Sequence, residues 1–138
     1  MKTSCLLVLL FASYALAETP VPKDTTPDEG LAKTFSAGKA GEFLDGASIK
    51  WTRERKCATC HTNVPYMLAR PKIAGGEDKP TKEVREFLEK TVTSWETTKP
   101  RRDYVVCATA FALSAHDSVT TNKLHPLTKI ALDKAWTV

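Results

Sequence analysis

The chain has 138 residues, of which 42% are hydrophobic, and its formal net charge is +4. This length fits a single small domain, and the mild charge excludes the strongly basic surface of a nucleic-acid-binding protein. Four cysteines, one of them in the first segment of the chain, are too few to indicate a disulfide framework.

The N-terminal segment predicts export. A short basic start precedes the apolar run 5–12, and Ala15-Leu16-Ala17 matches the small-x-small pattern of a signal-peptide cleavage site. The apolar run is too short to anchor the chain in a bilayer. We therefore expect a signal peptide over residues 1–17, a periplasmic or other extracytoplasmic location, and no membrane span after cleavage.

The mature chain is expected to begin with a leader and then a helical domain. Residues 18–26 are polar and contain prolines, which predicts a disordered leader, and the domain occupies residues 27–138. Within Thr26-Pro27-Asp28-Glu29, threonine fits the N-cap, proline N1 and glutamate N3. These positions predict a helix that runs to about Ser36.

The middle of the chain is expected to hold a helix that carries a cysteine motif. Gly38 and Gly41 weaken any continuation of the first helix. A second helix is predicted to carry Cys57-Ala58-Thr59-Cys60-His61 and to run through about Ala69, and residues 73–80 are expected to form a loop because they contain a Gly-Gly pair.

Three further helices are predicted after this loop. One has Thr81 as its N-cap and a single apolar stripe. The stripe consists of Val84, Phe87, Leu88, Val92 and Trp95. The next runs from about Arg102 to His116 and is apolar enough to be buried, together with Cys107. The last starts at Pro126. Its inward residues are expected to be Leu127, Ile130, Ala131 and Trp136. Because no strand pattern competes, the predicted fold class is all-α.

The C-x-x-C-H run is the attachment signature of a c-type haem. The thiols of Cys57 and Cys60 would form thioether bonds to the haem vinyl groups, and His61 would ligate the iron. On a helix, positions i, i+3 and i+4 share one face, so all three side chains could meet one porphyrin. Export strengthens this interpretation, because haem is attached outside the cytoplasm in bacteria.

Two other interpretations of the motif remain open. A redox-active C-x-x-C of the thioredoxin type would need a βαβ context, which the pattern does not indicate. A structural zinc site could use Cys57, Cys60 and Cys107 with either His61 or His125, because zinc takes four nitrogen or sulfur ligands.

The sixth ligand of a bound iron would decide its chemistry. His116 is the better distal candidate, since Asp117 could orient its ring, although a histidine at this place could simply favour a helix C-terminus. Met67 is more typical of a packing residue, and His125 of a surface or capping residue. A His/His pair would give a low-potential electron carrier, whereas an open site would suit a sensor.

Two short basic runs flank this part of the chain. Residues 53–56 could neutralise haem propionates or present a positive rim to an acidic redox partner. For residues 99–102 we expect solvated surface.

The segment from Trp51 to Pro71 resembles part of exported planctomycete-type proteins of the squalene–hopene cyclase-like, α/α-toroid superfamily. The similarity lies in the run K-C-A-T-C-H-T-N-V-P-Y-M-L-A-R-P and continues in 84–87, 99–101, 123–128 and 131–136. It implies paired helices like the first repeats of a toroid. The aspartate-rich acid motif and the tryptophan–glycine repeats of such proteins are not found, so cyclase chemistry is not implied.

The sequence therefore predicts an exported haem c domain for electron transfer, with an unknown redox partner. Whether it is also an enzyme stays open, although the missing cyclase acid motif argues against it. The alternatives are a haem-bearing N-terminal fragment of a cyclase-like enzyme, and a zinc-stabilised helical interaction domain. Because helical repeats bury their faces against neighbours, we expect either a further helical-repeat partner or a missing C-terminal part.

Overall fold

The computed structural model describes residues 19–24, 26–58 and 61–138. In this part of the chain the regular secondary structure consists of α-helices, without a strand, which confirms the all-α prediction. The helices are α1 (Ala37–Arg55), α2 (Asn63–Ala74), α3 (Lys79–Ser94), α4 (Asp103–Thr120) and α5 (Pro126–Ala135). Over the same residues, none of them is long and apolar enough to cross a membrane.

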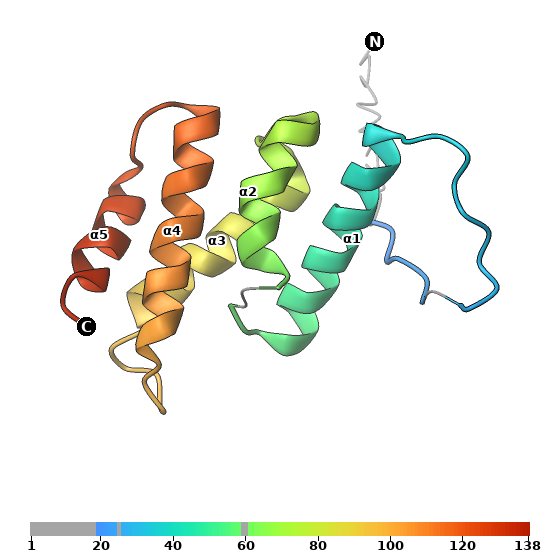
Figure 1. Ribbon diagram of the computed structural model, residues 1–138. Coiled ribbons are helices and arrows are strands. Elements are labelled where there is room, and N and C mark those ends of the chain that lie inside the picture. The colour runs from blue at the N-terminus through green and yellow to red at the C-terminus, as the bar shows by residue number, and fades with distance from the viewer. Residues whose placement is uncertain (1–18, 25, 59–60) are drawn as a thin grey trace, which may run out of the picture.

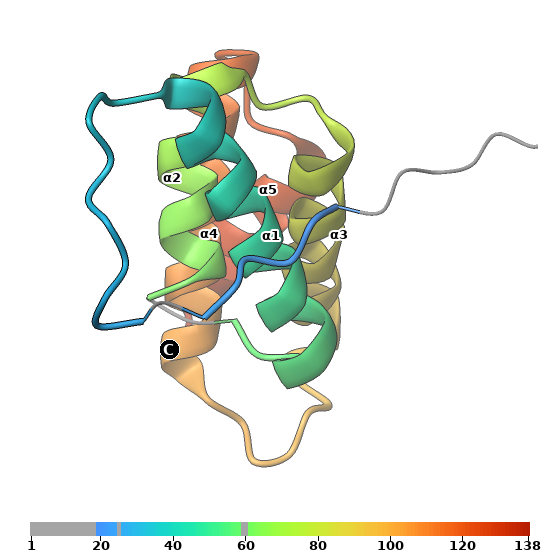
Figure 2. The ribbon, with the colours of Figure 1, turned by 90° about the vertical axis from the view of Figure 1, so that its right-hand side faces the viewer.

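Four helices form a row, and α3 lies across one face of it. Along the row, α1 packs against α2, α2 against α4, and α4 against α5 (Figure 1). α3 contacts all four from behind, and the turned view shows it to one side (Figure 2). We call the end of Figure 1 that holds the turns after α2 and α4 the upper end, and the end with the turns after α1 and α3 the lower end.

α1 begins later and runs longer than the sequence predicts. The expected helix over 27–36 is wrong, because residues 27–28 form only a turn, closed by a 3.1 Å hydrogen bond from the Glu29 amide to the Thr26 carbonyl. The helix instead starts at Ala37, with Ser36 as its N-cap. Gly38 and Gly41 lie inside this 19-residue helix and do not end it.

A glycine in α1 makes room for the leader. A Cβ atom built on Gly46 would lie 2.2 Å from the Pro20 carbonyl oxygen and 2.5 Å from a ring carbon of Pro22. Residues 19–24 therefore pass directly over the middle of α1. The helical penalty of about 1 kcal/mol for a glycine is offset by this close approach of two backbones.

The core lies between α3 and the row. Val84, Leu88 and Val92 are fully buried and Trp95 is 5% exposed, which confirms the predicted stripe. The N-cap of α3 is Asp78 rather than the expected Thr81, because the Asp78 carboxylate accepts a 3.0 Å hydrogen bond from the Thr81 amide. The loop between α2 and α3 is correspondingly short, covering only 75–78.

α4 is buried on one side only. Its core side contains fully buried Val106 and Leu113, whereas Tyr104 and Phe111 are more than half exposed. Cys107 is also exposed, so the prediction that it is buried is wrong. The reason is the arrangement of the row, since α3 covers one of its faces and the opposite face of α4 has no helix against it among the described residues.

α5 begins at Pro126 as predicted, with His125 as its N-cap. Ala131 is fully buried, but Ile130 is 41% and Trp136 87% exposed, so these two predicted core positions are wrong. The helix ends at Ala135 at the margin of the row, and this leaves Trp136 beyond the last packed turn.

Candidate functional site: the Cys57–His61 turn

The cysteine motif connects two helices at the lower end of the bundle. Lys56 adopts a left-handed conformation with a φ angle of 49° and ends α1. Cys57 and Ala58 are not helical, and His61 begins a turn that leads into α2. The expectation of one helical face for the motif is therefore wrong; Cys60 lies outside the described residues.

Two hydrogen bonds hold the start of the motif in place. The Cys57 carbonyl oxygen accepts one from the Trp51 indole N–H at 3.2 Å and one from the Asn63 side-chain amide at 3.0 Å. Asn63 is fully buried, and Trp51 is partly buried. The end of α1 and the beginning of α2 are thus joined to the same backbone atom, which fixes where the motif leaves α1.

The His61 ring is exposed and oriented. Its Nδ1 atom is 3.0 Å from the Thr62 hydroxyl oxygen, and its ring meets Trp51 edge to face, with centroids 4.9 Å apart and an interplanar angle of 84°. Because the described contact uses Nδ1, Nε2 is the nitrogen that remains for a ligand. A second hydrogen bond that orients the ring is typical of metal-binding histidines.

His61 borders a large open cavity. The cavity has a volume of about 530 Å³ and is lined by Phe43, Trp51 and the His61 ring, with Lys50 and Arg55 among its charged residues. A smaller apolar hollow of about 250 Å³ shares Phe43 and His61 and extends toward Ala69. The larger cavity is in the size range of sites that hold small molecules and cofactors.

Cys57 borders a different cavity. This one has a volume of about 260 Å³. Its lining consists of Lys56, Cys57, Ala58, Thr91, Trp95, Thr98, Lys99, Pro100, Arg102 and Val105. Cys57 and His61 therefore line two different cavities. The turn would have to present both residues to the same ring for haem attachment.

His116 lies at the upper end, away from His61. It is 2% exposed, and its Nε2 is 3.1 Å from the Gly76 carbonyl oxygen, just after the end of α2. His61 lies just before the start of α2, whose 12 residues span about 18 Å. Two nitrogens on one metal would lie about 4 Å apart, so the structure does not bring these two histidines together.

Both ring nitrogens of His116 have partners. Nε2 must donate to the Gly76 carbonyl, and Nδ1 faces an Arg85 guanidinium nitrogen at 2.8 Å, so it must accept. This pattern fits the neutral ring. Burial lowers the pKa of His116, and the Arg85 charge acts in the same direction.

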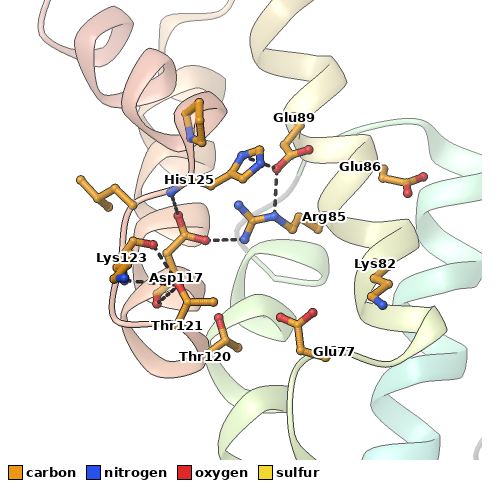
Figure 3. A pocket seen from close by; sticks show the side chains of 12 residues that line it. Glu77, Lys82, Arg85, Glu86, Glu89, Asp117, Thr120, Thr121, Lys123 and His125 are labelled. Atoms are coloured by element: carbon orange, nitrogen blue, oxygen red, sulfur yellow. Dashed lines mark hydrogen bonds and ion pairs between the residues drawn. The ribbon is translucent and has the colours of Figure 1, made fainter.

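Arg85 organises an ion-pair network that the sequence did not reveal. Its guanidinium is 2.8 Å from a Glu89 carboxylate oxygen and 2.5 Å from an Asp117 carboxylate oxygen (Figure 3). It also donates to the Thr128 hydroxyl oxygen at 3.2 Å. Asp117 also accepts a 2.7 Å hydrogen bond from the His125 amide. These bonds outweigh burial and hold the pKa of Asp117 below its ordinary value. Only the i,i+4 spacing of Arg85 and Glu89 could have indicated the network.

α4 continues to Thr120, beyond its predicted end at His116. Asp117 and Thr120 continue the helix, and Asn122 ends it with a φ angle of 52°. The same groups line one side of a cavity of about 530 Å³ between α3 and the turn after α4 (Figure 3). This cavity carries charges of both signs, including Lys82 and Glu86.

A second buried ion pair joins α1, α2 and α3. The Arg70 guanidinium contacts both oxygens of the Asp45 carboxylate, at 2.7 and 3.0 Å, and also the Asp78 carboxylate. The Tyr66 hydroxyl donates to Asp45 at 2.7 Å. Burial raises the pKa of Tyr66, so its hydroxyl stays protonated. These contacts explain why polar side chains can lie within the core.

Met67 and His125, the other candidate iron ligands, have roles in packing and helix capping. Met67 is fully buried in the core, which confirms its interpretation as a packing residue. His125 caps α5 by accepting a 3.3 Å hydrogen bond from the Leu127 amide. Over residues 19–24, 26–58 and 61–138, no group of three or more His, Cys, Asp or Glu side chains could hold a metal ion. Among the described candidate zinc ligands, His125 lies at the upper end, away from Cys57 and His61 at the lower end.

Comparisons with known proteins return no relative. No protein-family model, no curated protein and no solved structure matches the chain. The resemblance to toroid proteins therefore stays a prediction, and the motif turn with its surroundings is the part of the molecule that indicates a function.

Proposed function

We propose that the chain is an exported c-type haem-binding domain that transfers electrons, with thioether bonds at Cys57 and Cys60 and His61 as the proximal ligand. The proposal rests on the C-x-x-C-H spacing together with one observation. The exposed His61 ring is oriented through Nδ1 by Thr62 and by the edge of Trp51, beside a cavity of about 530 Å³.

The surroundings of the turn fit a large, flat, partly apolar ligand that carries acidic groups. Phe43 and Trp51 supply aromatic walls on the His61 side. Lys50 and Arg55 line the same cavity, and cations in these positions would neutralise haem propionates. Bound haem would supply one-electron chemistry, whose potential depends on the axial ligands and on burial.

The residues of the chain would have separate tasks in this function. Thr62 fixes the orientation of the His61 ring, so that Nε2 is directed away from the hydroxyl. Trp51 and Asn63 hold the Cys57 carbonyl and thus the origin of the turn. His116 is not part of the proposal, because its ring is hydrogen bonded at the other end of the bundle.

Expression of the full chain with a c-type maturation system tests the proposal. We expect a Soret band and a pigment that stays with the polypeptide in a denaturing gel. Cys57→Ser and Cys60→Ser should each weaken covalent retention, and His61→Ala should change the spin state. Cys107→Ser is the matched control, because this exposed cysteine lies outside the motif, and it should leave retention unchanged.

Two outcomes would reject the proposal. A colourless protein with stoichiometric zinc would instead support a zinc-stabilised domain. A pigment lost equally in the Cys107→Ser control would show that haem is not attached through the motif.

A further inference from the structure

The fold brings the two basic runs of the sequence to one cavity. Lys56 ends α1, whereas Lys99 and Arg102 belong to the connection between α3 and α4. All three cations are exposed, and all three line the 260 Å³ cavity next to Cys57 at the lower end. The second run is exposed, as the sequence predicted, and two of its cations line this cavity.

Trp95 gives this cavity a firm apolar wall. Its indole N–H donates to the Arg102 carbonyl oxygen at 3.2 Å, which ties the connection to the end of α3. The Arg101 guanidinium lies 4.9 Å and the Lys134 ammonium 5.7 Å from its ring centroid. The ring is 5% exposed. Two of the cations, Lys99 and Arg102, are thus on a connection that is anchored to the core.

The charge of this cavity differs from that of its neighbours. No aspartate or glutamate is among its described lining residues, whereas Glu54 lines the cavity beside His61 and Glu86 the one at the upper end. Carboxylates nearby are paired with other cations, as Glu96 is with Lys134 at 2.7 Å and Asp103 with Arg101 at 3.0 Å. Lys56, Lys99 and Arg102 consequently present a local excess of positive charge.

We propose that Lys56, Lys99 and Arg102, arranged around Trp95, form the docking surface for an acidic protein that exchanges electrons with this domain. The inference rests on the proposed function, because Cys57, a proposed attachment residue, lines the same cavity. A partner that docks here would lie beside Cys57, one of the residues that would hold the haem.

The dimensions favour a protein over a small ligand. A volume of about 260 Å³ is below the 300–1,000 Å³ that is usual for small-molecule sites. The cavity has room for one apolar side chain beside Val105 and Trp95, while exposed cations around it meet carboxylates of the partner surface. Opposite charges at such a surface accelerate association and make it dependent on salt.

The test uses an acidic flavodoxin as the probe. Its affinity for the haem-loaded protein is measured by calorimetry at low and at high salt, and the contact surface is mapped by NMR. We expect binding that weakens with salt and shifts the Trp95 indole resonance. Lys99→Glu combined with Arg102→Glu should weaken binding at low salt by at least about tenfold.

A matched control changes the same net charge elsewhere. Lys123→Glu combined with Lys129→Glu alters two exposed cations near the upper end and should change the affinity by less than about twofold, because these sites are more than a Debye length away. An equal loss in both double variants would reduce the effect to net charge and overturn the proposal. So would flavodoxin binding that does not respond to salt.

Two further measurements separate the possible causes of failure. The Cys57→Ser/Cys60→Ser protein, made without haem maturation, should still bind flavodoxin at this surface, so that docking is tested even if haem attachment fails. Citrate serves as a small carboxylate probe. Micromolar citrate binding that shifts the same Trp95 resonance would identify a small-molecule site and reject the docking surface.

Discussion

The two ends of the bundle differ in how their charges are used. At the upper end, Arg85 is surrounded by carboxylates and by the neutral ring of His116, and these groups are largely buried. At the lower end, His61 and a set of cations are exposed around two cavities. The Arg85 network pairs its polar groups with one another, whereas His61 and the cations Lys56, Lys99 and Arg102 are exposed to solvent.

This difference suggests that the upper end contributes mainly to stability and the lower end mainly to binding. Removing one member of a buried ion pair leaves an uncompensated charge and is costly, whereas exposed charges contribute little. Binding groups are best held on a rigid support. We infer that the upper network and the core support the fold, and that the motif turn can change without loss of the fold.

The largest expected effect is at Arg85. Arg85→Met leaves the Asp117 carboxylate, which is 3% exposed, without its cation, so we expect a loss of about 3–5 kcal/mol in the free energy of unfolding. Urea denaturation measures it. Arg53→Met is the matched control, because the Arg53–Glu83 pair is 46% and 31% exposed, and it should cost less than about 1 kcal/mol. Equal losses would contradict the contrast between the two ends.

Acidification should lower the free energy of unfolding through His116, at the same upper end of the bundle. The pKa of buried His116 is lowered from 6.5, so the unfolded chain binds this proton first as the pH falls. The contribution of His116 is complete above pH 6.5 and is lost as the pH falls below it, with a slope of at most about 1.4 kcal/mol per pH unit. The lowered pKa of Asp117 acts in the same direction, but only below its ordinary value of 3.8.

A His116→Gln variant tests this dependence on pH. Glutamine can donate to Gly76 and accept from Arg85 without titrating, so denaturation midpoints between pH 7 and pH 5 should change less than in the natural chain. An unchanged slope in His116→Gln would exclude His116 as its source.

A smaller effect is expected where the leader crosses α1. Gly46→Ala places a methyl group 2.2 Å from the Pro20 carbonyl oxygen and should displace the leader, which limited proteolysis of residues 19–24 would detect. Gly38→Ala is the control, since its nearest neighbour would be the Ser36 hydroxyl at 3.9 Å. That variant should stabilise the helix by about 0.5–1 kcal/mol. Leader cleavage that is unaltered in Gly46→Ala would contradict the packing.

The smallest effect on stability is expected in the motif turn. His61 is exposed, so His61→Ala should change the free energy of unfolding of the haem-free chain by less than about 0.5 kcal/mol. The same change should alter the haem spectrum. A large loss of stability would mean that the edge contact with Trp51 supports the fold, and that the two ends are less different than proposed.

Local patterns in the sequence were sufficient for several elements. The apolar stripe of α3 was predicted because positions three and four apart share a face, and the start of α5 because proline fits the first turn. Both signals depend only on neighbours along the chain. The motif itself was recognised from its spacing, and its proposed chemistry still depends on that spacing.

The sequence failed where distant segments meet. Gly38 and Gly41 were expected to weaken a helix, yet α1 continues through them because it packs against α2. Cys107 and Trp136 read as buried because they are apolar, yet the row of helices leaves one face of α4 and the end of α5 uncovered. Hydrophobicity indicates which residues can be buried, but the helices that pack against them decide which residues are buried.

By itself the sequence determined the helical class and the chemistry available at Cys57, Cys60 and His61, because periodicity and motif spacing are local properties. The tertiary structure decided the rest. It joined His116 to Arg85 instead of to His61, and it brought Lys56 and Lys99 to one cavity beside Cys57. Such pairings depend on which helix ends lie together, and spacing along the chain carries no record of that.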